Sequence, residues 1–250
     1  MKIFIGPLER KAQRLEIESK LRDIRIFAYI MGIAVPLAIV GLAIWIGGTS
    51  VPPEGEYSAV AQIEGVGSCS AFLVSEKHLI TAAHCLEFME EGDYLNLTFE
   101  GNSNIYKAKI IYRPSAYDKL EGDEQLKKDY AILELDSITF SEYYSLQLNS
   151  NSTKLTDPII VAGYPGGVTF SVAKGTVTGL SWRKHSETLQ IMAGAWPGNS
   201  GGPVIDASTN NVIGILNGTD SEMQGMLISL KTDVLEKDIE LAKRVGLTFE

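Results

Sequence analysis

The sequence predicts an all-β body, a barrel or a sandwich, behind an apolar N-terminal segment. Three observations lead to this prediction. From Tyr57 onward the 250-residue chain consists of short apolar runs separated by turns, which is typical of such folds. A polar stretch at 149–157 divides these runs into two sets. An uncharged stretch at 26–46 precedes them and is long enough to cross a bilayer.

Residues 8–25 mix charges with apolar residues at roughly helical spacing. Pro7 suits the first turn of a helix. A coiled coil is the weaker alternative, because the apolar pattern does not hold a heptad over three repeats. We expect residues 1–25 to form a solvent-exposed cytoplasmic segment beside the membrane.

Residues 26–46 are expected to form a transmembrane signal anchor, since at about 1.5 Å per residue they span a hydrocarbon core of roughly 30 Å. Tyr29 and Trp45 lie near its ends, where aromatic side chains favour the interface. A cleaved signal peptide fits less well, because the run is long and no small-residue cleavage site follows. Seven Lys/Arg precede the run, which places the N-terminus in the cytoplasm and the body in the periplasm or extracellular space. Residues 47–56 form a short linker.

The body contains two sets of predicted strands and a C-terminal helix. The charged stretch Asp118–Lys128 is expected to be an exposed loop, and the apolar spacing over 232–245 predicts an amphipathic helix. The first set of strands is Ala59–Ile63, Ala71–Val74, Leu79–Ala83, Tyr94–Phe99, Tyr106–Tyr112 and Ala131–Leu135. The second set is Ile159–Tyr164, Thr169–Val172, Gly175–Leu180, Leu189–Ala193, Gly202–Ile205, Val212–Asn217 and Gly225–Leu230.

The charge balance of the body is acidic. The whole chain has a formal net charge of −9, and residues 48–250 hold 15 Lys/Arg against 27 Asp/Glu, a net charge of −12. Such a surface argues against a nucleic-acid partner.

The two cysteines, Cys69 and Cys85, flank two apolar runs, Ser70–Val74 and His78–Ala82. A hairpin through the three residues between these runs would bring the cysteines within disulfide reach. Two reduced core thiols remain the alternative, and they would follow from a reducing compartment.

Three motifs carry candidate chemistry: Thr81-Ala-Ala-His84-Cys, Asp129-Tyr-Ala-Ile-Leu and Gly198-Asn-Ser200-Gly-Gly-Pro. Glycines around a serine permit a tight turn whose freed N–H groups can converge on a developing oxyanion. A serine hydroxyl is a poor nucleophile at neutral pH, so it needs a base to activate it and a group that orients the base. His84 and Asp129 supply both, in the order His, Asp, Ser.

With these motifs the chain resembles the trypsin/chymotrypsin-like serine peptidases over residues 57–245. The resemblance implies a peptidase domain at 57–250, built from two six-stranded antiparallel β-barrels at about 57–148 and 157–232 and a C-terminal helix at 232–245. It also implies a bridge between Cys69 and Cys85. No cofactor or metal is expected.

The resemblance assigns the catalytic roles as follows. Ser200 attacks the scissile carbonyl, His84 takes its proton and returns it to the leaving amine, and Asp129 orients the imidazole. The N–H groups of Gly198 and Ser200 form the oxyanion hole.

Two positions depart from the family pattern. Asn199 stands where zymogen-activated members have an aspartate that pairs with a new N-terminus, so no activation cleavage is expected. The chain is therefore closer to bacterial-type members, such as the Deg/HtrA and glutamyl-endopeptidase branches, and it leaves no room for a PDZ module. Asn217 stands where a serine hydroxyl supports the triad aspartate, and its amide can still donate there.

The resemblance also places the pocket for the residue before the scissile bond. Gly194 stands where trypsin-like members have an aspartate, and Leu216 where glutamyl endopeptidases have a histidine. We therefore expect an apolar pocket of moderate size. Its residues are Gly194, Ala195, Leu216, Asn217, Gly218, Thr219 and Gly225.

The sequence predicts a membrane-anchored serine endopeptidase that acts on protein or peptide substrates. The alternative is a peptide-binding or scaffold protein on a peptidase fold, with the site retained but without turnover.

Overall fold

The computed structural model describes residues 55–237 except 66–67, 103, 115–116, 137–144, 151, 184 and 220–224. The predicted cytoplasmic segment and anchor, most of the linker, and the chain beyond 237 therefore lie outside the described residues. Within the described part of the chain, no helix has the length and hydropathy needed to span a membrane.

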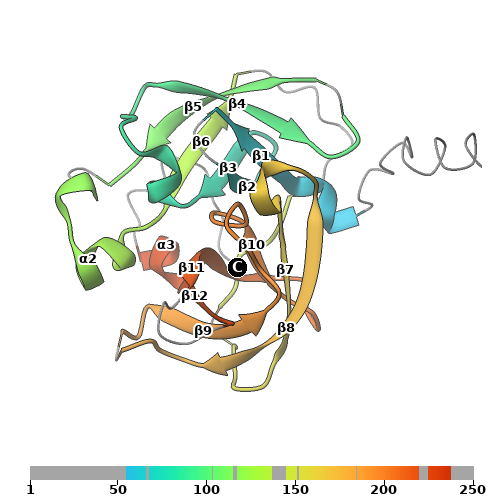
Figure 1. The fold of residues 1–250 in the computed structure, drawn as a ribbon, viewed down its shortest axis with the longest axis vertical. Coiled ribbons are helices and arrows are strands. Elements are labelled where there is room, and N and C mark those ends of the chain that lie inside the picture. Colours follow the sequence, from blue (N-terminus) through green and yellow to red (C-terminus); the bar gives the residue numbers. More distant parts are fainter. Residues whose placement is uncertain are drawn as a thin grey trace, which may run out of the picture. The chain divides into compact units, whose positions relative to one another are not determined.

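The described strands form two closed antiparallel barrels, as the resemblance implied (Figure 1). The first has the order β1-β2-β3-β6-β5-β4 and the second β10-β11-β12-β9-β8-β7. The first barrel comprises β1 (Val60–Glu64), β2 (Cys69–Leu73), β3 (His78–Thr81), β4 (Tyr94–Phe99), β5 (Tyr106–Tyr112) and β6 (Ala131–Leu135). The second comprises β7 (Pro158–Gly163), β8 (Ser171–Gly179), β9 (Thr188–Ala193), β10 (Pro203–Asp206), β11 (Val212–Thr219) and β12 (Met226–Lys231).

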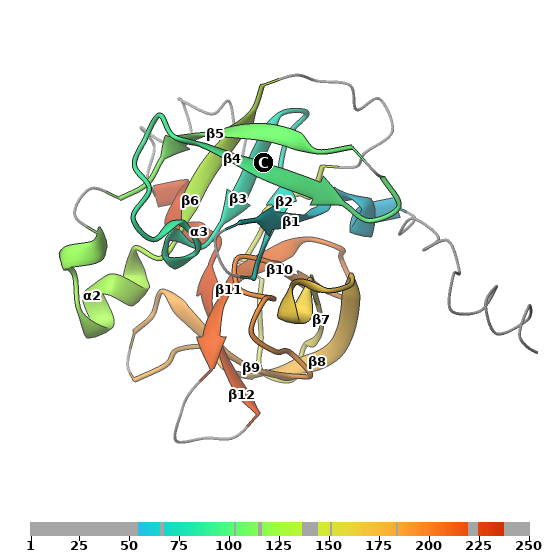
Figure 2. The same ribbon diagram turned by 45° about the horizontal axis from the view of Figure 1, so that its top comes forward.

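The burial of each strand reflects its place in the barrel. In β4 the side chains alternate, with Leu95, Leu97 and Phe99 buried and Tyr94 exposed, because successive residues face opposite sides of the sheet. Every residue of β2 is buried. This strand lies on the side of the first barrel that contacts β7 of the second, so both of its faces are covered. Figure 2 shows the same grouping of strands in the turned view.

Two details differ from the sequence prediction. The runs Thr169–Val172 and Gly175–Leu180 belong largely to one strand, β8, which pairs with β7 along its length. The pairing of β7 with β8 continues through Gly175, because a glycine permits the close approach of β9 on the other side of the strand. A Cβ at this position would overlap Met192 O.

The charged connection before β6 is not simply a loop. It contains the 3₁₀ turn η3 (Tyr117–Lys119) and the short helix α2 (Gly122–Lys127). Two local contacts support the helix: Lys127 pairs with Glu124 at 2.8 Å, and Lys128 N–H closes its last turn. The other short helices are η1 (Gly55–Ala59), η2 (Ala83–Leu86), η4 (Pro165–Gly167) and α3 (Asp233–Lys237), where the predicted C-terminal helix begins.

A disulfide joins Cys69, the first residue of β2, to Cys85 in η2, with a Cα–Cα distance of 5.9 Å. The predicted hairpin between β2 and β3 is present, with Phe72 opposite Ile80, and it brings the two cysteines together. The bridge is therefore confirmed, and the alternative of two reduced thiols is not.

Reduction of this bridge is expected to lower the free energy of unfolding by about 3 kcal/mol, because it closes a loop of this length in the unfolded chain. Urea unfolding with and without reductant measures the loss. The double variant Cys69→Ala/Cys85→Ala should have this lower stability both with and without reductant. Equal stability of oxidised and reduced wild type would contradict the prediction.

Candidate active site

His84 and Asp129 meet at one edge of the first barrel. His84 lies in η2, just after β3, and Asp129 lies just before β6. These strands are antiparallel neighbours, with Thr81 opposite Ala131. Residues that leave the end of β3 and residues that enter β6 therefore lie side by side, which explains how positions 45 residues apart come together.

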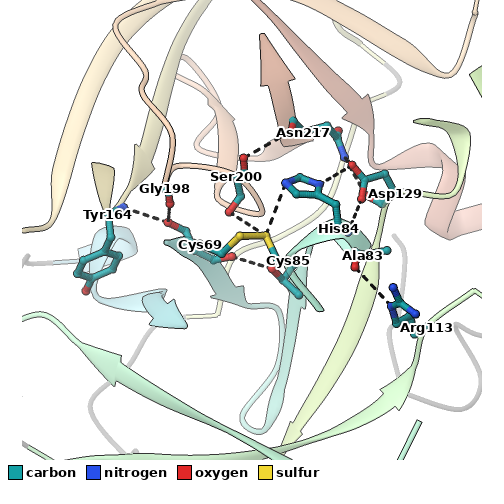
Figure 3. Close-up of a disulfide and its surroundings, with 12 residues drawn as sticks. Cys69, Ala83, His84, Cys85, Arg113, Asp129, Tyr164, Gly198, Ser200 and Asn217 are labelled. Atoms are coloured by element: carbon teal, nitrogen blue, oxygen red, sulfur yellow. Dashed lines mark hydrogen bonds and ion pairs between the residues drawn. A yellow bond between two sulfur atoms is a disulfide. The ribbon is translucent and has the colours of Figure 1, made fainter. Parts of the chain in front are cut away.

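The Asp129 carboxylate holds His84 through two hydrogen bonds (Figure 3). His84 Nδ1 lies 2.8 Å from Asp129 Oδ2, and the backbone N–H of His84 donates to Oδ1 at 2.9 Å. The aspartate side chain is only 7% exposed, whereas the histidine side chain is 36% exposed. The carboxylate thus holds the imidazole ring at Nδ1 and leaves Nε2 available for another partner.

Asn217 completes the support of Asp129 from the second barrel. Its amide Nδ2 donates to Asp129 Oδ2 at 2.9 Å and to Asp129 O at 2.8 Å. Its Oδ1 accepts from Leu230 N at 2.7 Å, which fixes the orientation of the buried amide. The predicted donation from this asparagine to the aspartate is therefore present.

These contacts shift the pKa values of His84 and Asp129. The pKa of His84 lies above its ordinary value: burial of the ring acts against this, but the hydrogen bond and charge of Asp129, with a contribution from Glu87, outweigh it. The pKa of Asp129 lies below its usual range. Burial again acts in the opposite direction, and the hydrogen bonds and charge of His84, with the Asn217 amide, outweigh it. At neutral pH the aspartate is therefore ionised and can stabilise an imidazolium.

Ser200 lies beside His84 in the loop before β10 (Figure 3). Its hydroxyl donates to Asn217 O at 3.5 Å. Among the described residues, no hydrogen bond joins Ser200 Oγ to His84 Nε2. Hydrogen bonds between a nucleophile and its base are often long or misaligned without substrate, and a turn of the Ser200 side chain changes the partner of its hydroxyl.

The loop around Ser200 leaves two N–H groups unused. Neither Gly198 N–H nor Ser200 N–H donates to any group in the described part of the chain. Gly198 is buried and has φ +107°. Ser200 is half-buried. Because buried N–H groups are almost always paired, the unpaired donor of Gly198, with that of Ser200 on the next turn of the loop, indicates a site that receives an anion or a developing negative charge.

The predicted pocket segments gather at one end of three neighbouring strands. β12 lies between β9 and β11, with Met226 opposite Met192 and Thr219 opposite Leu227. Ala193 ends β9 and residues 194–196 follow it, while Gly218 and Thr219 end β11 and Gly225 precedes β12. All seven predicted pocket residues are described. Ala195 packs on the apolar cluster that contains Leu216, and Gly194, Thr219 and Gly225 are exposed.

The disulfide borders the site, since Cys85 Sγ lies 3.8 Å from His84 Nε2 and 3.6 Å from Ser200 O. Cys69, His84 and Cys85 are close enough together to be considered as metal ligands. Their two sulfurs are bonded to each other, however, and offer no thiolate. The bridge therefore acts here as a covalent link beneath the site.

Two buried residues near the site, Tyr117 and Arg113, were not found from the sequence. Tyr117 is buried, and burial raises its pKa well above the usual range, as do the charge of Asp129 and a hydrogen bond to it. Arg113 is also buried and stacks on the Tyr117 ring at 5.3 Å. Arg113 binds Asp118 through two hydrogen bonds and donates to Ala83 O at 3.4 Å. Both lie near the charged stretch that was expected to be a loop, where the sequence gives no sign of these contacts.

Comparisons with known proteins find one family model and several similar proteins. The model of the trypsin-like peptidase domain matches residues 69–215. The putative protease Do-like 12, mitochondrial, from Arabidopsis thaliana is 32% identical over 154 residues, which are 59% of this chain and 28% of that protein. Protease Do-like 2, chloroplastic, from the same plant is 30% identical over 63% of this chain and 25% of its own length. The chain thus spans about a quarter of the length of these curated relatives.

Solved structures share the fold. A serine-to-alanine mutant of Rv3671c from M. tuberculosis, in its inactive form, has a TM-score of 0.58 at 20% identity, over 77% of this chain and 89% of that one. An HtrA-type protease has a TM-score of 0.60 at 19% identity, over 76% of this chain and 65% of that one. The family model matches more than half of the chain and includes the β2–β3 hairpin, His84, Asp129 and Ser200. The chain belongs to the trypsin-like peptidase family.

Proposed function

We propose that the chain is a serine endopeptidase that uses His84, Asp129 and Ser200. One arrangement carries the proposal: a buried, ionised Asp129 orients His84, Ser200 lies beside that ring, and two N–H groups of the Ser200 loop are unpaired among the described residues. Ser200 Oγ attacks the carbonyl carbon as His84 Nε2 takes its proton. The same proton then passes to the leaving amine, and water repeats the sequence on the acyl-enzyme.

The unpaired N–H groups of Gly198 and Ser200 are proposed to bind the oxyanion. Two fixed carbonyls support this role. Pro197 O accepts from Gly166 N at 2.7 Å, and Asn199 O accepts from Gly202 N at 2.9 Å. The C=O and N–H of a trans peptide point in opposite directions. The two N–H groups therefore point away from these partners, and no rearrangement of the loop is needed when the negative charge develops.

Protein or peptide substrates are the proposed partners. The HtrA-type protease that shares this fold was solved with a decapeptide, and peptide chains are what a site of this kind hydrolyses. The Ser200 hydroxyl donates to Asn217 O and not to His84 Nε2. A scaffold protein without turnover would show the same hydrogen bond, so this contact does not distinguish the two functions.

Labelling with a fluorophosphonate separates these two functions. Its phosphorus forms a bond to Ser200 Oγ and releases fluoride only if the serine is activated. We expect stoichiometric labelling of the full-length chain, lost in Ser200→Ala and strongly slowed in His84→Ala. Folded chain that stays unlabelled would support the scaffold.

Anchoring to a membrane through residues 26–46 remains part of the proposal, with the peptidase domain outside the cytoplasm. The uncharged run and the seven Lys/Arg before it support this arrangement. Protease added to intact cells, or to spheroplasts if an outer membrane is present, should degrade the 48–250 body and spare residues 1–25. Protection of the body would reverse the orientation.

The proposed specificity is for Val, Ala, Leu or Met before the scissile bond. Gly194 stands at the pocket wall with room around it, since a Cβ there would approach Ala173 Cβ only to 3.9 Å. The described pocket residues contain no acid to compensate the desolvation of Lys or Arg, which costs several kcal/mol. Asp220 and Glu222 lie outside the described residues.

A peptide library cleaved by the full-length chain tests this specificity. Cleavage after Val, Ala, Leu and Met should exceed cleavage after Phe and Tyr, and cleavage after Lys and Arg should be rare. Products that mostly end in Lys or Arg would contradict the proposal, and would direct attention to Asp220 and Glu222.

A further inference from the structure

Ser70 lies at the junction of the two barrels, next to the disulfide. It is the second residue of β2, pairs with Gln62 of β1, and is 0% exposed. A serine buried so completely must have partners for its hydroxyl. Its partners belong to the second barrel, on segments that follow it by 94 and 128 residues.

Ser70 makes three hydrogen bonds to the second barrel. Its Oγ donates to Gly198 O at 2.8 Å and accepts from Tyr164 N at 2.9 Å. Its backbone N–H donates to Ser200 O at 2.8 Å. The first two bonds converge on Ser70 Oγ. A single residue of the first barrel thus holds the loop that carries Ser200 at two points.

These bonds complete the fixation of residues 197–200, which we name the oxyanion loop. Each of its four carbonyls has a partner. Gly166 N binds Pro197 O and Gly202 N binds Asn199 O, whereas in the described part of the chain Ser70 supplies the N–H or O–H donor to the carbonyls of Gly198 and Ser200. The N–H groups of Gly198 and Ser200 are left free among the described residues. Without Ser70 Oγ, the peptide between Gly198 and Asn199 loses the bond to its carbonyl and keeps, among the described residues, the bond from Asn199 N to Trp196 O at 3.1 Å.

The packing around Ser70 leaves little space for an alternative arrangement. A Cβ on Gly163 would lie 2.7 Å from Ser70 Oγ and equally close to Asn199 Oδ1. A Cβ on Gly201 would overlap Ser70 O and Thr81 Oγ1. Ser70 is therefore packed against the glycine backbone of Gly163 in β7 and of Gly201, the residue that follows the oxyanion loop. A change at Ser70 is expected to be transmitted to the loop.

We propose that Ser70 is a positioning residue, which holds the oxyanion loop so that the N–H groups of Gly198 and Ser200 face the substrate carbonyl. The inference rests on the proposed peptidase function. Ser70 forms no hydrogen bond to His84 or Asp129. Its effect therefore reaches the transition state through the donors of the loop and not through the base.

Kinetics of Ser70→Ala in the full-length chain tests the proposal, with the best fluorogenic peptide from the library. Loss of one oxyanion donor typically lowers kcat by about 10²–10³-fold. Since Ser70 acts through the loop, we expect kcat to fall about 10- to 100-fold with KM within about threefold. The acid limb of the pH profile should keep its midpoint, because His84 and Asp129 are untouched.

Thr188 provides a matched control far along β9 from the pocket end. It too is 0% exposed, and its hydroxyl likewise donates to a carbonyl, His185 O at 2.8 Å, and accepts from a backbone N–H, Trp182 N at 2.8 Å. Thr188→Val removes a hydroxyl from the same kind of bond network. We expect kcat of this variant to stay within about twofold of wild type, even if its melting temperature falls as much as that of Ser70→Ala.

The outcomes separate as follows. Unchanged kcat in Ser70→Ala, or an equal loss in Thr188→Val, overturns the inference while the wild type remains active. A shifted acid limb in Ser70→Ala also overturns it, because the effect would then pass through His84. If Ser70→Ala does not fold, Ser70→Cys replaces it: the thiol is a weaker donor of similar shape, and the same fall in kcat is expected. A wild type that neither cleaves nor labels overturns the proposed function, and the inference with it.

Discussion

Ser200→Ala is expected to lower kcat by roughly 10⁶-fold, and His84→Ala by a similar factor, because the nucleophile and the base act as one unit. For the same reason, the double variant should be no slower than either single one. Asp129→Asn is expected to lower kcat by about 10⁴-fold. Its side chain keeps the shape of the carboxylate but can no longer accept from His84 Nδ1 with a full charge.

The pH dependence follows from the same contact. His84 must be neutral to act as a base, so kcat/KM falls as the pH drops through the pKa of His84. That pKa is raised by Asp129, so the midpoint of the acid limb should lie above about 6.5, the ordinary value for histidine. In Asp129→Asn the charge is gone and burial of the ring remains, so the residual activity should have an acid limb at lower pH.

His78 is the control for these variants. It lies at the opposite end of β3 from His84 and its Nδ1 is bonded to Ser75 Oγ at 2.9 Å. His78→Gln can keep this bond, so kcat should stay within about threefold of wild type. Thermal unfolding of every variant shows whether lost activity reflects lost structure. Wild-type turnover by Asp129→Asn would mean that another acid is the third member of the triad.

The sequence predicts the fold and much of the site because their signals are local. Each motif sits at the end of a short apolar run, and antiparallel pairing of β3 with β6 then brings His84 to Asp129. The disulfide was predictable in the same way, since a hairpin needs only the two runs between its cysteines. All six strands of the first barrel were predicted, because each is a short apolar run between turns.

The rest depends on contacts between distant parts of the chain. Ser70 is one small residue in a buried strand, and nothing near it in sequence indicates that its hydroxyl binds Gly198. Tyr117 and Arg113 lie near charged residues, a pattern typical of exposed loops, yet both are buried. The continuous β8 was missed because Gly175 reads as a break in the sequence, whereas in the barrel it admits the backbone of β9.

Gly198→Ala is expected to lower kcat/KM by at least about 10²–10³-fold, the effect of losing one oxyanion donor. Two physical reasons apply. Gly198 has φ +107°, a backbone conformation that alanine rarely adopts. A Cβ there would also overlap Tyr164 O and lie 2.6 Å from Gly166 N, both of them backbone atoms with little freedom to move. The loop must therefore shift away from the 164–166 turn, and the hydrogen bond from Gly166 N to Pro197 O is lost.

Gly92→Ala is the control that distinguishes backbone strain from steric overlap. Gly92 has nearly the same backbone conformation, φ +101°, but a Cβ there would meet nothing within 4 Å. This control therefore carries the conformational strain without the overlap, and it lies outside the proposed site. We expect Gly92→Ala to lose some thermal stability with kcat/KM within about twofold of wild type, since the strain is local. Gly198→Ala should lose turnover while Ser200 and His84 are still present, and its fluorophosphonate labelling should slow in parallel. If Gly198→Ala turns over substrate as fast as Gly92→Ala, the N–H of Gly198 does not bind the oxyanion, and the second donor must come from elsewhere in the site.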